Sequence, residues 1–203
     1  LFDVAKRFDK LEFIDLGSGF KVAYKEGDVT TDIADVGSKL SKAFNDFCNL
    51  YGKPLELWFE PGKYLVSESG TFLVNVNVIK PTPATVFVGV DSGFNHLIRP
   101  MLYNAYHEIE NISNPKGTER IYTIVGNLCE TDTFAWDRML NEVNEGDVLA
   151  FHNAGAYCFE MSMNYNSRCR PAEVLLHDGK HSLIRKREVF DEIQKNVISI
   201  DFD

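Results

Sequence analysis

The residues from Glu60 to Lys63 read E-P-G-K and place a carboxylate directly after an apolar run. A charge in such surroundings is costly unless an opposite charge meets it, so a cationic partner is expected for Glu60. A second motif, I-D-L-G-S-G-F from Ile14 to Phe20, contains a glycine turn whose backbone N–H groups could bind a phosphate. Each signal alone is weak, because glycine turns and surface acids are common.

The elements around these two motifs indicate that both lie at one end of a sheet. Glu12–Leu16 and Leu55–Phe59 are predicted strands, and the helix between them begins after Thr31 or Asp32 and ends at Gly52. A strand, helix, strand unit makes its two strands parallel, so both motifs follow the carboxyl ends of neighbouring strands. Sites of α/β proteins are built at this end.

Candidate chemical groups also occur in the second half of the chain. Cys129 and Glu130 place a thiol beside an acid after an apolar strand, although a buried thiol beside a surface acid is the commoner arrangement. Arg99, with Tyr103 four residues later, could bind a carboxylate through two hydrogen bonds. Tyr157 could reach a phosphate, although such a tyrosine usually packs in a core. A functional role for these residues is therefore a hypothesis, which would be supported if they lay at a common site.

From Thr71 onward apolar and polar residues alternate, which is typical of strands. Strands are predicted at Phe72–Val78, Thr85–Val90, Tyr106–Ile109, Arg120–Val125, Asp147–Asn153 and Glu173–Leu176. Asp178-Gly179 suits a tight turn that pairs the last of these with Ser182–Arg187. The chain is thus expected to be α/β over residues 1–64 and mostly antiparallel β over residues 65–203. Two parallel strands leave both sheet edges open, so further strands are expected upstream.

The composition narrows the class of protein. The 203 residues are 44% hydrophobic and 25% charged, which is ordinary for a soluble globular protein. No apolar run approaches the roughly 18 residues of a membrane helix, and a cytoplasmic protein is expected. The net charge of −9 argues against nucleic acid or an acidic membrane as partner. The four cysteines lack C-x-x-C spacing, so thiols and no metal site are expected, and His107 and His152 are expected to be structural.

The motifs L-G-S-G-F, E-P-G-K, R-P-M-L-Y-N-A-Y-H-E-I, L-C-E-T-D-T and N-Y-N-S-R-C-R-P-A-E-V-L occur in this order along the chain. Together they resemble the second half of the fold type III pyridoxal phosphate-dependent decarboxylases, most closely the branch that acts on diaminopimelate. The resemblance implies the last two βα units of an alanine-racemase-like (β/α)8 barrel over residues 1–64. A C-terminal antiparallel β-domain with substrate and dimer-interface residues is implied over residues 65–203.

The resemblance also implies pyridoxal 5'-phosphate as cofactor, with Glu60 facing the protonated ring nitrogen. The implied cofactor-binding residues are Gly17, Ser18, Gly19, Glu60, Pro61, Gly62, Lys63 and Tyr157. The implied residues that bind the amino acid substrate are Lys63, Arg99, Tyr103, Glu130 and Tyr157. Cys129 is implied as the catalytic group that returns a proton to the carbon that loses carbon dioxide. Cys129 and Glu130 would reach the neighbouring subunit's site, so the active sites of a homodimer would be shared.

The implied reaction of this carboxy-lyase converts meso-2,6-diaminopimelate to L-lysine and carbon dioxide, the last step of lysine biosynthesis. In the family, the lysine that holds the cofactor lies in an early barrel strand, so activity is expected only together with that barrel half. The chain departs from the usual motifs at Ser18, Lys63, Thr131 and Asp132, without losing a chemical role. Two alternatives stay open: a decarboxylase of another basic amino acid or carboxynorspermidine, and a non-catalytic homologue that binds a partner.

Overall fold

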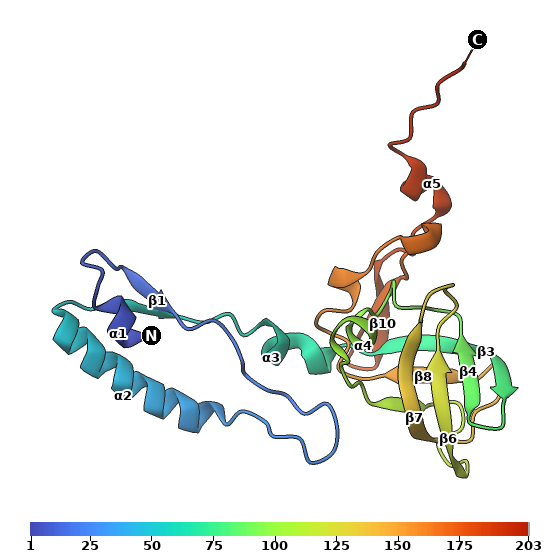
Figure 1. Cartoon of the computed structure of the whole chain (residues 1–203), viewed down its shortest axis with the longest axis horizontal. Coiled ribbons are helices and arrows are strands. Elements are labelled where there is room, and N and C mark those ends of the chain that lie inside the picture. Colours follow the sequence, from blue (N-terminus) through green and yellow to red (C-terminus); the bar gives the residue numbers. More distant parts are fainter. Residues whose placement is uncertain (203) are drawn as a thin grey trace. The chain divides into compact units, whose positions relative to one another are not determined.

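The computed structural model of the chain describes residues 1–202 and divides into two compact units, residues 1–68 and the residues from Ser69 onward. The helices and strands of the first unit are α1 (Phe2–Ala5), β1 (Phe13–Asp15), α2 (Ile33–Tyr51), β2 (Glu56–Trp58) and α3 (Gly62–Val66) (Figure 1). Those of the second unit are β3 (Phe72–Pro81), β4 (Val86–Val90), α4 (Arg99–Tyr103), β5 (Ile109–Asn111), β6 (Glu119–Val125), β7 (Thr133–Asn141), β8 (Val148–Phe151), β9 (Glu173–His177), β10 (Lys180–Arg185) and α5 (Phe190–Gln194). Among the described residues, no helix has the length and apolar character needed to cross a membrane.

The predicted strand, helix, strand unit is confirmed in the first unit. Asp32 is the N-cap of α2, and its side chain accepts the N–H of Asp35. The helix ends at Gly52, whose φ of 86° is a left-handed conformation that favours glycine. β1 and β2 run parallel, with Ile14 opposite Leu57. The carboxyl ends of both strands therefore point the same way.

One face of this two-stranded sheet is covered and the other is not. Phe44 and Phe47 of α2 are buried in one cluster with Ile14, and burying such a side chain contributes about 1.5–3 kcal/mol. On the strands, Phe13 and Trp58 stack with ring centroids 4.2 Å apart, yet 43% and 48% of their surfaces stay exposed. The aromatic residues thus form an apolar surface on the first unit.

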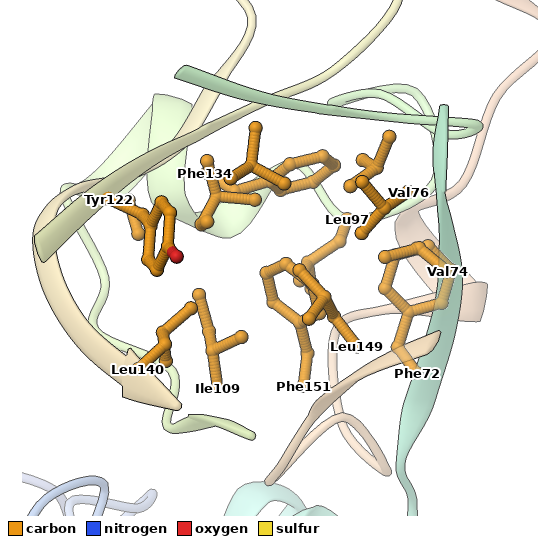
Figure 2. Packing of buried hydrophobic residues seen from close by; sticks show 14 of the residues in the cluster. Phe72, Val74, Val76, Leu97, Ile109, Tyr122, Phe134, Leu140, Leu149 and Phe151 are labelled. Carbon is orange, nitrogen blue, oxygen red and sulfur yellow. The ribbon is translucent and has the colours of Figure 1, made fainter. Parts of the chain in front are cut away.

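The second unit is built on a six-stranded sheet in the order β5-β8-β3-β4-β6-β7. The end strands β5 and β7 contact each other, so the sheet curls around its core. Figure 2 shows side chains from several strands pointing to a common centre, including Phe72, Val74, Tyr122, Leu149 and Phe151. Most neighbours are antiparallel, but β4 and β6 are parallel, because the chain between them passes through α4 and β5 before it returns.

The hairpin prediction is confirmed and two other details are corrected. β9 and β10 pair across Asp178 and Gly179, both of which have positive φ angles. The predicted strand Tyr106–Ile109 is wrong in its position, because β5 runs from Ile109 to Asn111. β7 was not predicted, since Asp137 adopts a φ of 48° at a register shift and interrupts the alternation of that strand.

Candidate functional site

The glycine turn and the E-P-G-K motif meet in the first unit. The N–H of Glu60 donates to the carbonyl of Gly17 over 2.7 Å. A Cβ atom placed on Gly17 would lie 3.9 Å from Oε2 of Glu60, so this carboxylate lies beside the turn. Gly17 and Gly19 have φ angles of 68° and 111°, which other residues rarely adopt. The parallel pairing of β1 and β2 thus brings the two motifs to one place.

The surroundings of the turn are polar and open. Glu60 and Ser18 are exposed, and a Cβ atom on Gly19 would meet nothing within 4 Å. Gly62 begins α3 directly after Pro61, and the Nζ atom of Lys63 lies 5.7 Å from the ring centre of Tyr24. The expectation of costly apolar surroundings for Glu60 is corrected, because the apolar run before it is itself partly exposed. The turn thus combines open backbone with a hydroxyl, a carboxylate and an ammonium group.

Arg99 is held by a histidine in the second unit. Arg99 begins α4 and is only 9% exposed, and its Nη1 lies 3.3 Å from Nε2 of His107. Nδ1 of His107 lies 2.9 Å from the carbonyl oxygen of His152. A carbonyl only accepts, so Nδ1 carries the proton and Nε2 accepts from Arg99. Burial lowers the pKa of His107 to about 4, which keeps the ring neutral beside the arginine. Tyr103, on the same helix, is 61% exposed.

The side chains of Cys129 and Glu130 are exposed, and both contact the turn that contains Tyr165 and Asn166. The Nδ2 group of Asn166 donates to Sγ of Cys129 over 3.3 Å. The hydroxyl of Tyr165 donates to Oε1 of Glu130 over 2.9 Å, and this hydrogen bond raises the pKa of Tyr165. Tyr165 and Asn166, which are consecutive in the chain, therefore each form a hydrogen bond with one of the two consecutive candidates, Glu130 and Cys129.

Asp132 anchors the loop that carries Cys129 and Glu130. Its buried carboxylate accepts the N–H groups of Phe94 and Leu128 over 2.7 and 3.0 Å. A Cβ atom on Gly126 would collide with this carboxylate, so the loop needs a glycine there. Burial raises the pKa of Asp132, while the two backbone hydrogen bonds favour its charged form. The residue that departs from the usual motif thus has a structural role.

Tyr157 lies on a loop with a strained backbone. Its φ of 58° is unusual for a tyrosine, and 47% of its surface is exposed. The N–H of Ala154 donates to the carbonyl of Gly70 over 2.8 Å, and a Cβ on Gly70 would lie 2.5 Å from the backbone of Gly155. This close backbone contact holds the loop, and the tyrosine side chain does not pack in the core.

The structure therefore places the sequence-predicted residues in separate groups. Glu60 to Lys63 join the turn from Gly17 to Gly19 in the first unit, while Arg99 with Tyr103, Cys129 with Glu130, and Tyr157 lie on three segments of the second unit. His107, which was expected to be structural, is confirmed as a buried partner of Arg99. No role was predicted for the other residues that hold these groups, which are Asp132, Tyr165 and Asn166. Each of the four lies in a family motif, which was the available signal: His107 in R-P-M-L-Y-N-A-Y-H-E-I, Asp132 in L-C-E-T-D-T, and Tyr165 and Asn166 in N-Y-N-S-R-C-R-P-A-E-V-L.

The combination of a strand, helix, strand unit and a curled sheet domain defines a two-part α/β plus β architecture. Two family models match the chain: the pyridoxal-dependent decarboxylase, pyridoxal binding domain, over residues 3–67, and the pyridoxal-dependent decarboxylase, C-terminal sheet domain, over residues 63–155. The chain belongs to the family of pyridoxal-dependent decarboxylases, which confirms the resemblance seen in its motifs.

Named relatives agree with this assignment. The diaminopimelate decarboxylase of Methanothermobacter thermautotrophicus is 43% identical over 203 residues, which cover 95% of this chain and 47% of the relative. The crystal structure of diaminopimelate decarboxylase from M. jannaschii in co-complex with L-lysine is 34% identical with a TM-score of 0.83, covering 98% of this chain and 46% of that one. The enzyme from Helicobacter pylori complexed with L-lysine is 35% identical with a TM-score of 0.82, covering 96% and 48%. The chain spans about half the length of the relatives it matches.

Proposed function

We propose that the chain forms the C-terminal part of a pyridoxal phosphate-dependent diaminopimelate decarboxylase. The complete protein would convert meso-2,6-diaminopimelate to L-lysine and carbon dioxide. The observation that carries this proposal is the meeting of Glu60 with the glycine turn, because a carboxylate beside a phosphate-binding turn suits a phosphorylated cationic ring. The relatives named diaminopimelate decarboxylase and the L-lysine bound to two of the solved structures support this substrate class.

The residues around the turn fit pyridoxal phosphate. The open backbone at Gly19, the Ser18 hydroxyl and the Lys63 ammonium group suit the phosphate, with Gly17, Pro61 and Gly62 as further cofactor-binding residues. Tyr157 of the second unit is included because the family motifs imply it. The Glu60 carboxylate suits a protonated ring nitrogen, since an opposite charge favours the protonated form. When bound, the cofactor supplies an electron sink for the bond that breaks.

The other residues act on the substrate. Diaminopimelate carries two carboxylates and two amines, so the cationic side chains of Arg99 and Lys63 are assigned to carboxylates and the Glu130 carboxylate to an amine. Tyr103 and Tyr157 offer exposed hydroxyl groups to the same molecule. The Cys129 thiol gives its proton to the carbon that loses carbon dioxide, and the electron pair of the broken carbon–carboxyl bond forms the new C–H bond.

The same proposal includes the assembly and the location. Residues 1–64 would complete a (β/α)8 barrel as its last two βα units, with the exposed Phe13 and Trp58 turned to the rest of that barrel. Residues 65–203 would form the β-domain of a homodimer in the cytoplasm, in which Cys129 and Glu130 serve the partner's site.

A chimera tests this function. The part of the Methanothermobacter relative that lies outside the matched region is joined to residues 1–203 of this chain, and lysine and carbon dioxide are measured with diaminopimelate as substrate. We expect lysine formation, and we expect Glu60→Ala to lower kcat at least about 100-fold, because the ring nitrogen would lose the carboxylate that favours its protonated form.

The controls separate the alternatives. Asp46→Ala changes an exposed acid on α2, away from the glycine turn, and is expected to leave turnover unchanged. Preferred decarboxylation of ornithine, arginine or carboxynorspermidine by the folded chimera would assign another substrate. A folded chimera that binds pyridoxal phosphate but releases no carbon dioxide from any of them would contradict catalysis by this chain.

A further inference from the structure

Two neighbouring hydrogen bonds join the loop of Cys129 and Glu130 to a turn far away in the sequence. Tyr165 donates to Glu130, and Asn166 donates to the sulfur of Cys129. The partners are 35 and 37 residues apart along the chain, so these contacts come from the tertiary fold. The turn therefore contacts both Cys129 and Glu130, the two side chains of this loop that have roles in the proposed function.

The backbone of the turn makes this double contact possible. Asn166 and Ser167 have φ angles of 54° and 55°, and the N–H of Ser167 donates to the carbonyl of Asn164 over 2.9 Å. Asparagine tolerates a left-handed conformation better than most residues, because its short polar side chain bonds locally. Asn166 can therefore adopt the left-handed backbone of the turn and also donate a hydrogen bond from its side chain.

A closed circuit of contacts fixes the position of the turn relative to the loop. The ring of Tyr165 lies against the ring of Phe94, with centroids 5.1 Å apart. The backbone N–H of Phe94 donates to Asp132, which lies two residues after Glu130. The circuit runs from Glu130 through Tyr165 and Phe94 back to the same loop, so two separate contacts link Tyr165 to the loop of Glu130.

We propose that Tyr165 and Asn166 are positioning residues, Tyr165 for the orientation of the Glu130 carboxylate and Asn166 for the Cys129 sulfur, which it holds by a hydrogen bond. The amide N–H of Asn166 stabilises the sulfur more when it is a thiolate than when it is a thiol, because hydrogen bonds to charged acceptors are stronger. The sulfur can therefore keep the same hydrogen bond after its proton has left. The assignment to catalysis rests on the proposed function, whereas the effect on the thiol does not.

Alkylation of Cys129 by iodoacetamide tests Asn166 without any enzyme activity. In residues 1–203, Cys48 and Cys169 are replaced by serine, and Cys158 stays because it is buried and burial raises its pKa to about 12. The alkylation rate is followed across pH values that bracket the ordinary thiol pKa of about 8.5. The titratable groups beside the thiol are Glu130 and Tyr165, and both are unchanged in this experiment.

Two variants of Asn166 keep the left-handed backbone and change the donor. Asn166→Gly removes the side chain, and Asn166→Asp replaces the amide with a carboxylate of the same shape. We expect alkylation at neutral pH to fall about threefold in the glycine variant and about tenfold in the aspartate variant, because the thiolate loses a donor and then gains a negative neighbour. Asn104→Gly, at another left-handed asparagine in the second unit, is the matched control and is expected to react like the parent chain.

Tyr165→Phe is examined in the chimera. Loss of the hydroxyl leaves the aromatic contact but frees Glu130, so KM for diaminopimelate is expected to rise about three- to tenfold while kcat changes less than twofold. The Asn166 variants are expected to lower kcat with little change in KM. Equal effects on both parameters in all variants would indicate a purely structural turn and would overturn the proposal.

The outcomes distinguish this proposal from the proposed function. Alkylation rates within twofold of the parent in both folded Asn166 variants would overturn the role of Asn166, even if the chimera makes lysine. A chimera without turnover would contradict the proposed function, while slower alkylation of the variants would still establish the hydrogen bond to the thiol.

Discussion

At the scale of single residues, the neutral state of His107 is the clearest electrostatic feature of the second unit. Its pKa is lowered from 6.5 to about 4 by burial, with a smaller contribution from the charge of Arg99. Between pH 6.5 and 4, His107 is protonated in the unfolded chain but neutral in the folded chain. The free energy of unfolding should therefore fall as the pH is lowered from 6.5 toward 4. The loss from this group should amount to at most about 3 kcal/mol. Urea unfolding at several pH values measures it.

The control for this prediction is His107→Gln, which keeps a polar side chain but cannot titrate. The variant is expected to be less stable than the parent near neutral pH, with a flatter dependence on pH between the two values. Parallel pH profiles for the variant and the parent would show that His107 is already protonated or does not titrate in this range.

At the scale of elements, α2 carries a glycine that its environment does not require. Gly37 lies on the exposed side of this helix, and a Cβ atom there would meet nothing within 4 Å. Gly37→Ala is expected to stabilise the first unit by about 1 kcal/mol, because glycine has more backbone freedom to lose in a helix. Thermal unfolding followed by helical circular dichroism measures the change.

The matched control is Gly126→Ala, where the same substitution places a Cβ atom against the Asp132 carboxylate. This variant is expected to lower the stability of the second unit and to free the loop of Cys129. A stabilising effect there would mean that Asp132 does not occupy the described position.

At the scale of the whole molecule, the proposed homodimer with shared sites makes a quantitative prediction for mixed subunits. Chimeras with Glu60→Ala and with Cys129→Ala each carry one defective half of every site. After unfolding and refolding an equal mixture, half of the dimers combine the two variants, and each such dimer has one intact site. About a quarter of the parent activity should therefore return. Activity that stays at the level of the separate variants would show that Glu60 and Cys129 of one subunit serve the same site.

The parts of this protein that local patterns determine were predicted closely. The helix from Ile33 to Tyr51 follows from apolar spacing with a cap at each end, and its position between two strands implies parallel pairing. That pairing alone brings the glycine turn to Glu60. The existence of β7 was not predicted, because a register shift and charged residues disturb the alternation on which a strand prediction depends. The position of β5 was not predicted either, because its pairing with β8 is a tertiary contact.

The sequence by itself thus determined the family motifs, the two-part architecture and the meeting of two motifs at one sheet end, since these depend on short-range periodicity and on connection geometry. Only the tertiary structure decided which residues hold Arg99, Glu130 and Cys129. His107 lies eight residues from its arginine, and Tyr165 and Asn166 lie 35 and 37 residues from their partners. Such pairs are selected by the packing of separate loops on a common core, and no spacing along the chain encodes that choice.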